Sequence, residues 1–344
     1  MPRAAYTMGA MQRTSEQASI APRTPAPHAF WREVGVYAVL AGLYVAIALL
    51  EPSFRGWVNF RNVLTQIAIV AVVAVGMTAV IISGGIDLSV GSVAALAACV
   101  PAVLMAHHGW GGASGVALTL ALGTALGLLN GAAITYVGLP PFIATLALMV
   151  MARGLAFVVS GGGAIYNLPA AYLWPGSGNV AEGVPLILKL PAMVALMALL
   201  YAAGHLVMQR TRLGRYLYSV GANEEASRLS GVPTARVKLF GYGLCGFLSG
   251  LAGMLYTGYV GAAEPTIGDG LELDAIAAVV IGGTSLSGGQ GNLPGTLAGA
   301  LLIGLVRNGL NLMQVNSNYQ RVAIGGIIFA AVTIDMFQKR RRRV

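Results

Sequence analysis

The chain has 344 residues, of which 56% are hydrophobic and only 10% are charged, and its mean hydropathy is +0.74. A soluble globular protein carries about 25% charged residues, because its surface must be hydrated. The composition therefore excludes a soluble globular protein and predicts an all-α polytopic membrane protein. The 47 glycines agree with this class, because small residues allow transmembrane helices to approach closely.

Residues 1–32 are predicted to form a polar, disordered cytoplasmic tail. This segment contains Pro22, Pro25 and Pro27 together with four arginines. No cleavable signal is predicted, because the first apolar run begins too late for one.

Apolar stretches then recur through residues 33–338, and each is long enough to cross a hydrocarbon core about 30 Å thick. We predict ten transmembrane helices, some of them broken by Gly or Pro. The third, eighth and ninth are the shortest or most interrupted. The predicted spans are 34–50, 62–82, 88–106, 114–136, 142–160, 184–208, 237–261, 273–287, 294–312 and 319–337.

The basic residues predict the orientation of these spans. Fifteen of the 21 Lys and Arg lie in the first tail, in the loop from about 209 to 238, or in the C-terminal segment 339–344. Because Lys and Arg are retained in short cytoplasmic loops, these three segments and both termini are expected in the cytoplasm. The net charge of +9 would otherwise suggest nucleic-acid binding, but its distribution favours membrane topology.

Two similar glycine-rich elements interrupt the apolar runs, at residues 84–91 and 282–289. Interrupted helices at membrane depth are tolerated where the freed backbone faces protein or a watery cavity, so these elements are candidates for the substrate path. Tight turns between spans are an equally open interpretation. Asp87 either belongs to that path or caps a helix beginning at Leu88. The path candidates are Gly84, Gly85, Asp87, Ser89, Arg153, Gly282, Gly283 and Ser285.

Residues 286–290 read Leu-Ser-Gly-Gly-Gln, a string that also serves as a signature of ATP-binding-cassette ATPases. An ATPase of that kind also needs a phosphate-binding loop in which Lys follows Gly. None of the three lysines, Lys189, Lys238 and Lys339, follows Gly. The string is therefore interpreted as a structural turn, and no ATP hydrolysis is expected on this chain.

The loop between the sixth and seventh predicted spans contains the pattern of a short helix. Asn223 suits an N-cap, Glu224 and Glu225 suit the positive end of a helix, and Gly231 suits its end. A helix of about two turns is unstable alone in water, so we expect it to dock. It would dock either on a partner protein or on its own membrane domain.

Charged residues also occur within or beside the spans. Arg153 and Arg307 lie well inside predicted spans, where they either line a polar path or tie helices together. A group of carboxylates is expected on the outer side, as a docking rim or as a solvated loop: Glu264, Asp269, Glu272 and Asp274.

Taken together, these motifs resemble the permease subunits of bacterial ATP-binding-cassette importers for monosaccharides of the ribose, xylose, arabinose and galactose type. The resemblance covers roughly residues 35–337. It is carried by residues 84–92, by 138–146 with Ala152-Arg153-Gly154, by the loop 221–231, and by 282–295.

The resemblance implies a multi-pass permease of the bacterial inner membrane, paired with a second copy around one path. Cytoplasmic ATPase subunits, which carry the ATP and Mg²⁺, would dock on the coupling loop within 209–236. A periplasmic sugar-binding protein would deliver the sugar and supply most of the specificity. The expected coupling residues are Gly221, Asn223, Glu224, Glu225, Ala226, Ser230 and Gly231.

Two other classes of membrane protein, a secondary transporter and a membrane enzyme, are alternatives to an importer permease. An ion-coupled secondary transporter usually needs carboxylates buried within its spans, whereas nearly all carboxylates here fall near span ends. A membrane enzyme needs a clustered nucleophile, base or metal set. The four histidines and the two cysteines, Cys99 and Cys245, show no such spacing, so no catalytic, cofactor or metal site is expected on this chain.

Overall fold

The computed structural model describes residues 27–180 and 190–341, and this part of the chain forms helices without any β-strand. The all-α polytopic class predicted from composition is confirmed. The elements are α2 (Pro27–Leu50), η1 (Pro52–Arg55), α3 (Trp57–Ile82), α4 (Val90–His108), α5 (Gly112–Ala132), η2 (Ala133–Val137), α6 (Pro141–Ser160), α7 (Ala170–Ser177), α8 (Ala192–Arg210), α9 (Arg212–Ala222), α10 (Glu224–Leu229), α11 (Thr234–Val260), α12 (Leu271–Ile281), α13 (Leu293–Leu312) and α14 (Ser317–Arg341).

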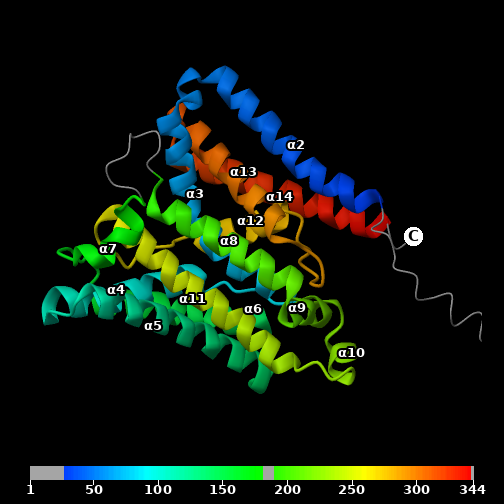
Figure 1. The fold of residues 1–344 in the computed structure, drawn as a ribbon, viewed down its shortest axis with the longest axis horizontal. Coiled ribbons are helices and arrows are strands. Elements are labelled where there is room, and N and C mark those ends of the chain that lie inside the picture. Colours follow the sequence, from blue (N-terminus) through cyan, green and yellow to red (C-terminus); the bar gives the residue numbers. More distant parts are fainter. Residues whose placement is uncertain (1–26, 181–189, 342–344) are drawn as a thin grey trace, which may run out of the picture.

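The helix α11 forms the centre of the bundle, where it packs against α3, α4, α5 and α7 (Figure 1). Both α3 and α11 are buried over most of their length, as expected for helices that are apolar on all sides. By contrast, α5, α6 and α8 expose many large apolar side chains. Such outward faces suit contact with lipid or with another transmembrane surface.

The contact between α5 and α11 depends on glycine. Gly123 and Gly127 of α5 lie against Gly246 and Gly250 of α11. A Cβ atom added at Gly127 would overlap the carbonyl oxygen of Tyr242, and one added at Gly246 would overlap that of Gly123. The two backbones therefore touch directly, which is the close approach that small residues permit between membrane helices.

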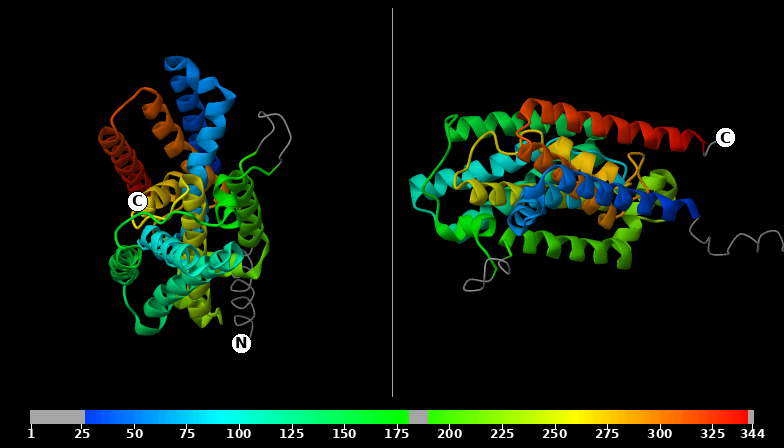
Figure 2. Two further views of the ribbon diagram at one scale, coloured as in Figure 1. Left: turned by 90° about the vertical axis from the view of Figure 1, so that its left-hand side faces the viewer. Right: turned by 90° about the horizontal axis from the view of Figure 1, so that it is seen from above.

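The two ends of the bundle differ in what they carry. The start of α2 and the end of α14 lie at the same end of the bundle as α9 and α10, which we call the α10 end (Figures 1 and 2). The turn between α2 and α3, together with α7, lies at the opposite end. This arrangement is the one expected for an even number of crossings.

The predicted number of ten spans is approximate. Seven helices in the described part are long and apolar enough to cross a membrane, namely α3, α4, α5 with η2, α6, α8, α11 and α13. In α2 the apolar stretch Gly35–Leu50 is shorter. The single span predicted at 273–287 is wrong, because α12 ends at Ile281 and a turn follows. Its 11 residues extend only about 16 Å, roughly half of the hydrocarbon core.

Other boundaries also differ from the sequence prediction. The predicted span 184–208 begins only at Ala192, and residues 181–189 lie outside the described part. The short helix α7 was not predicted. Of the predicted N-terminal tail, residues 1–26 lie outside the described part, and α2 already begins at Pro27. Of the predicted basic tail, residues up to Arg341 belong to α14, and 342–344 lie outside.

Replacing Gly127 by Leu is expected to destabilise the bundle by about 3 kcal/mol or more, because the added side chain meets backbone that cannot move aside. The measurement is the melting temperature and the monodisperse yield of the detergent-purified chain. Gly325→Leu is the matched control, since nothing lies within 4 Å of a Cβ at that helical position. Equal melting temperatures for the two variants would contradict the close backbone contact.

Candidate translocation and coupling site

The first glycine-rich element forms the turn between α3 and α4. Gly84 adopts a positive φ of 85°, which reverses the chain after α3. The buried Asp87 carboxylate then accepts hydrogen bonds from the Ser89 amide at 2.8 Å and from the Ser89 hydroxyl at 2.6 Å. The predicted helix start at Leu88 is wrong, because α4 begins at Val90 with Ser89 as its N-cap residue. Asp87 orients that residue and does not itself cap the helix.

Side chains from two other helices hold this turn in place. Asn130 of α5 donates a hydrogen bond to the Ser89 hydroxyl at 2.9 Å. Tyr242 of α11 donates to the Ile86 carbonyl at 3.2 Å. Neither residue was predicted from the sequence. For Asn130, a single amide within a long apolar span is a signal that could have indicated a buried hydrogen bond.

The second glycine-rich element forms the turn between α12 and α13. Gly283 adopts a φ of 92°, the Ser285 amide donates to the Gln290 carbonyl at 3.0 Å, and the Gly288 amide donates to the Ser285 carbonyl at 3.0 Å. The interpretation of residues 286–290 as a structural turn is therefore confirmed. Gly282 lies at the base of the turn, against Gly295 of α13.

The two turns meet each other and the end of α9. The Gly289 amide donates to the Ile82 carbonyl at 2.9 Å, which joins the second turn directly to the end of α3. At Gly221 an added Cβ atom would overlap the Ile82 carbonyl oxygen and would lie 2.7 Å from the Gly289 nitrogen. We call this backbone contact among Gly84, Gly221, Gly288 and Gly289 the glycine junction.

The loop that carries the predicted coupling residues begins at this junction. Asn223 caps α10 by accepting from the Ala226 amide at 2.9 Å, and Gly231 follows the helix with a φ of 81°. The predicted short helix is therefore confirmed, while the preceding helix α9 was not predicted. The hydroxyls of Ser219 and Ser227, 2.7 Å apart, join α9 to α10.

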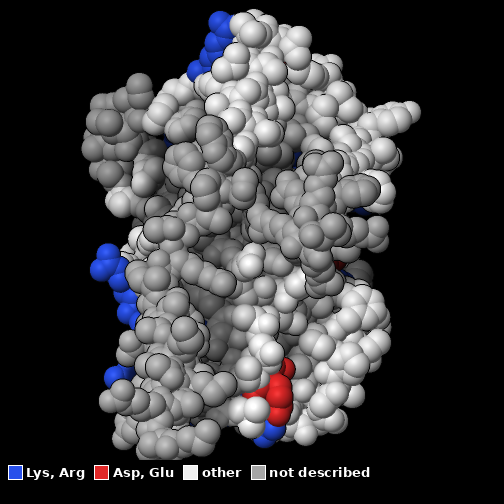
Figure 3. Space-filling model, turned by 90° about the vertical axis from the view of Figure 1, so that its right-hand side faces the viewer, with Lys and Arg blue, Asp and Glu red and all other residues white. Residues whose placement is uncertain are grey.

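The face of α10 away from α9 is exposed and charged. Its side chains include Leu229, which is 76% exposed. Glu225 pairs with Arg228 at 2.7 Å, and Glu224 receives a hydrogen bond from Lys238 at 2.6 Å. Acidic atoms gather beside basic atoms near the lower edge of the face that carries α10 (Figure 3).

The hydrogen bond and charge of Arg228 lower the pKa of the Glu225 carboxyl below its usual value of 4.5. The folded-state pKa is therefore below that of the unfolded chain, so the pair stabilises α10 at neutral pH. This contribution is lost only as the pH falls through the lowered pKa.

A cavity of about 280 Å³ lies between the glycine junction and α10. Its wall includes Ser83, Gly85 and Ser287 from the two turns, Glu224 from α10 and Lys238 from the start of α11. The cavity therefore joins both glycine-rich elements to the segment that carries the coupling residues.

Arg153 lies apart from the glycine junction. Its guanidinium donates to the carbonyls of Pro265 at 2.6 Å and Ile267 at 2.8 Å, so it holds the turns before α12 against α6. Asp269 and Glu272 lie near enough to act electrostatically on this guanidinium. Glu272 also lies beside Gly91 in the first turn of α4. We call Arg153, Asp269 and Glu272 the charged cluster.

The structure therefore separates the acidic residues that were expected on one outer rim. Asp269 and Glu272 belong to the charged cluster. Asp274 instead pairs with Arg307 at 2.9 Å, which ties α12 to α13. For Arg307 this contact favours the interpretation as a residue that ties helices together.

The sequence is similar to those of known transport proteins. Residues 59–332 match a family model described as the permease component of the branched-chain amino acid transport system. The chain belongs to this family. It is 41% identical over 303 residues to the ribose import permease protein RbsC of Escherichia coli strain K12, covering 86% of this chain and 92% of that protein.

Two further relatives extend the comparison. The ribose import permease protein RbsC of Bacillus subtilis strain 168 is 42% identical, with 88% of this chain and 92% of the relative covered. The xylose transport system permease protein XylH of Escherichia coli strain K12 is 34% identical, with 90% and 92% covered. No solved structure matches the chain.

Replacing Gly221 by Ala is expected to break the glycine junction, although Gly-to-Ala changes inside helices usually stabilise by about 0.5–1 kcal/mol. Hydrogen exchange should report faster exchange of the Gly289 amide, which bonds Ile82 across the junction. Gly241→Ala in α11 is the matched control, because the nearest atom to its Cβ is 3.8 Å away. Unchanged exchange in Gly221→Ala would rule out the tight contact at this position.

Proposed function

We propose that this chain is the permease subunit of an ATP-binding-cassette importer that carries a monosaccharide across the bacterial inner membrane. The observation that carries this proposal is its identity of about 40% to ribose import permeases over nearly their whole length. The names of the relatives favour a sugar importer over an ion-coupled secondary transporter. ATP hydrolysis belongs to separate ATPase subunits.

The ATPase subunits dock on α10 from the cytoplasm, so both termini lie on the cytoplasmic side. The exposure of Leu229 and of the charged residues around it supports docking on a partner rather than on the chain's own membrane domain. Movement of α10 passes through the glycine junction, because Gly221 contacts both turns through the backbone. The path candidates Gly84, Gly85, Gly283 and Ser285 would respond through these turns.

The sugar path passes the charged cluster on the face formed by α6 and the turns before α12. Asp269 is exposed and Glu272 is half-buried, while α6 beside them exposes apolar side chains such as Met151 and Leu155. Charged groups at membrane depth are costly in lipid and are normally found facing water or protein. This face therefore lines the path, and a second copy of the chain closes it. A periplasmic sugar-binding protein delivers the sugar at the end opposite α10.

Replacing Glu224 and Glu225 together by Lys is expected to abolish sugar-stimulated ATP hydrolysis by the assembled importer. The change reverses the charge of α10 and removes both of its ion pairs. The assay compares ATPase activity with and without sugar and binding protein in proteoliposomes. Full coupling in a properly inserted variant would disprove docking at α10.

Two controls accompany this experiment. Glu51→Lys reverses a carboxylate at the end of the bundle opposite α10 and should leave the binding of the ATPase subunits unchanged, whereas the α10 variant should lose it. The purified chain without ATPase subunits should hydrolyse no ATP, and measurable turnover would contradict the assignment of hydrolysis to a partner.

Replacing Asp269 by Asn is expected to reduce sugar uptake about tenfold, because a carboxylate bonds a sugar hydroxyl more strongly than a neutral amide does. Uptake is measured in proteoliposomes that contain the complete importer. Glu51→Gln is the matched control, being a carboxylate away from the charged cluster. For the second copy, Leu273→Cys, at an exposed position of α12, should crosslink between two chains. Wild-type uptake by Asp269→Asn, or failure of the crosslink, would contradict this placement of the path.

A further inference from the structure

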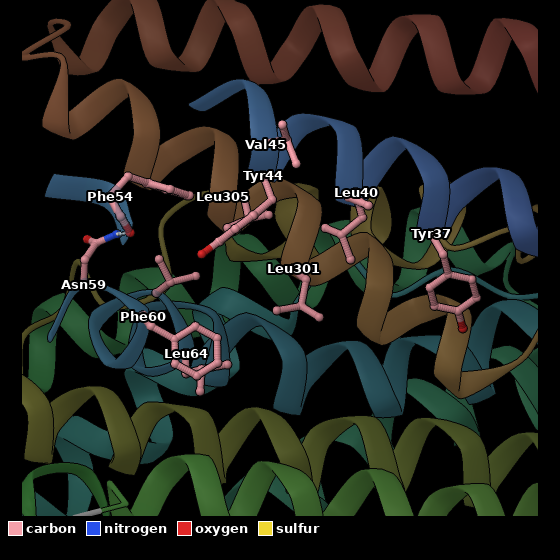
Figure 4. A pocket seen from close by; sticks show the side chains of 12 residues that line it. Tyr37, Leu40, Tyr44, Val45, Phe54, Asn59, Phe60, Leu64, Leu301 and Leu305 are labelled. Carbon is pink, nitrogen blue, oxygen red and sulfur yellow. Dashed lines mark hydrogen bonds between the residues drawn. The ribbon is translucent and has the colours of Figure 1, made fainter. Parts of the chain in front are cut away.

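An apolar groove of about 350 Å³ opens between α2 and the pair formed by α3 and α13 (Figure 4). Leu40 and Tyr44 of α2 lie across it from Leu301 of α13. The helix α2 packs against α13 and η1 but makes only slight contact with α3, which leaves the space open. Its wall also includes Tyr37, Ala41 and Val45 of α2, Phe54 of η1 and Asn59 of α3.

The wall of the groove is apolar apart from Asn59 and the hydroxyls of Tyr37 and Tyr44, which are too few to pair the hydroxyls of a sugar. The amide of Asn59, the one amide side chain in its wall, already donates to the Phe54 carbonyl at 3.1 Å and to Asn308 at 3.0 Å. A sugar would bring hydroxyls that need hydrogen bonds, and burying them without partners costs several kcal/mol. The occupant must therefore be apolar over the length of the groove.

The dimensions and position of the groove fit an acyl chain. Its residues on α2, from Tyr37 to Val45, extend roughly 12 Å along the helix. One leaflet of a hydrocarbon core about 30 Å thick has about this depth. The residues on α3 lie in its first two turns, so the groove belongs to the half of the bundle away from α10.

A positively charged residue, the exposed Arg55, directly follows the groove residue Phe54 in the chain. Arg55 belongs to the short helix η1, and its Nε donates to the Ala48 carbonyl at 2.6 Å. This bond fixes the side chain while its terminal nitrogens stay available, and in the described part of the chain Arg55 forms no ion pair. A fixed guanidinium is well suited to phosphate, which it can bind through two parallel hydrogen bonds.

We propose that this groove binds one phospholipid of the leaflet opposite α10, with an acyl chain between α2 and α3 and the phosphate at Arg55. The lipid completes the packing of α2, which otherwise rests on α13 and η1 through a small apolar cluster that includes Ile47, Phe54 and Leu305. The site is independent of the proposed sugar path, which lies at the charged cluster.

The test is native mass spectrometry of the full chain, purified in detergent and supplied with phosphatidylglycerol. The wild-type chain should retain one lipid molecule. Ala41→Phe fills the groove and should abolish retention, whereas Ala198→Phe on the exposed face of α8 should not. Arg55→Gln should weaken retention about tenfold through the lost charged hydrogen bond, whereas Arg321→Gln on exposed α14 should not.

Four outcomes would overturn the proposal. Retention that is equal in Ala41→Phe and the wild type would place the lipid elsewhere. Retention of diacylglycerol as strong as that of phosphatidylglycerol would remove the role of Arg55, and binding of glycerol phosphate alone would show an ion site without the acyl chain. A crosslink between two copies through Ala41→Cys would give the groove to a second chain instead.

Discussion

Direct contact between polypeptide backbones is the constraint on which the rest of this structure depends. In lipid, apolar side chains gain little by leaving the solvent, so helices must associate through close packing. Gly123 and Gly127 on α5 let α11 approach until carbonyl oxygens of one helix meet Cα atoms of the other. The same device recurs at Gly253, which lies against the Ala94 carbonyl of α4. The central position of α11 follows from these contacts.

The glycine junction is also a direct backbone contact, and it lies next to α10, the helix on which we propose that the ATPase subunits dock. Where side chains separate two elements, small displacements can be absorbed by changes of rotamer, but a contact between backbones transmits them directly. Gly221 lies two residues before Asn223, the N-cap of α10, and its neighbours are the Ile82 carbonyl and the Gly289 amide. In the proposed mechanism, a shift of α10 would therefore reach both interrupted elements at once, as docking of ATPase subunits on α10 requires.

The described residues form few ion pairs, and these lie in separate parts of the bundle. The ion pairs Glu224–Lys238 and Glu225–Arg228 lie on the exposed loop, where they shape the surface of α10 and contribute little to stability. Arg307 and Asp274 join two helices inside the bundle. Within residues 27–180 and 190–341, only the charged cluster combines an arginine held by carbonyl groups with carboxylates that remain open to the surface. This combination distinguishes it as a candidate site for a polar substrate.

The sequence by itself determined the fold class, the approximate spans and the helix at 223–231, because these depend on local hydropathy and on capping residues. The sequence also predicted that both glycine-rich elements interrupt the helices, because the effect of glycine on backbone conformation is local. Only the tertiary structure decided that these elements meet each other at Gly221, that Asp269 and Glu272 lie near enough to Arg153 to act on its charge while Asp274 pairs with Arg307, and that α12 stops at Ile281. Those features depend on contacts between residues far apart in the chain. The hydropathy pattern does not specify them, because it does not determine which helices become neighbours.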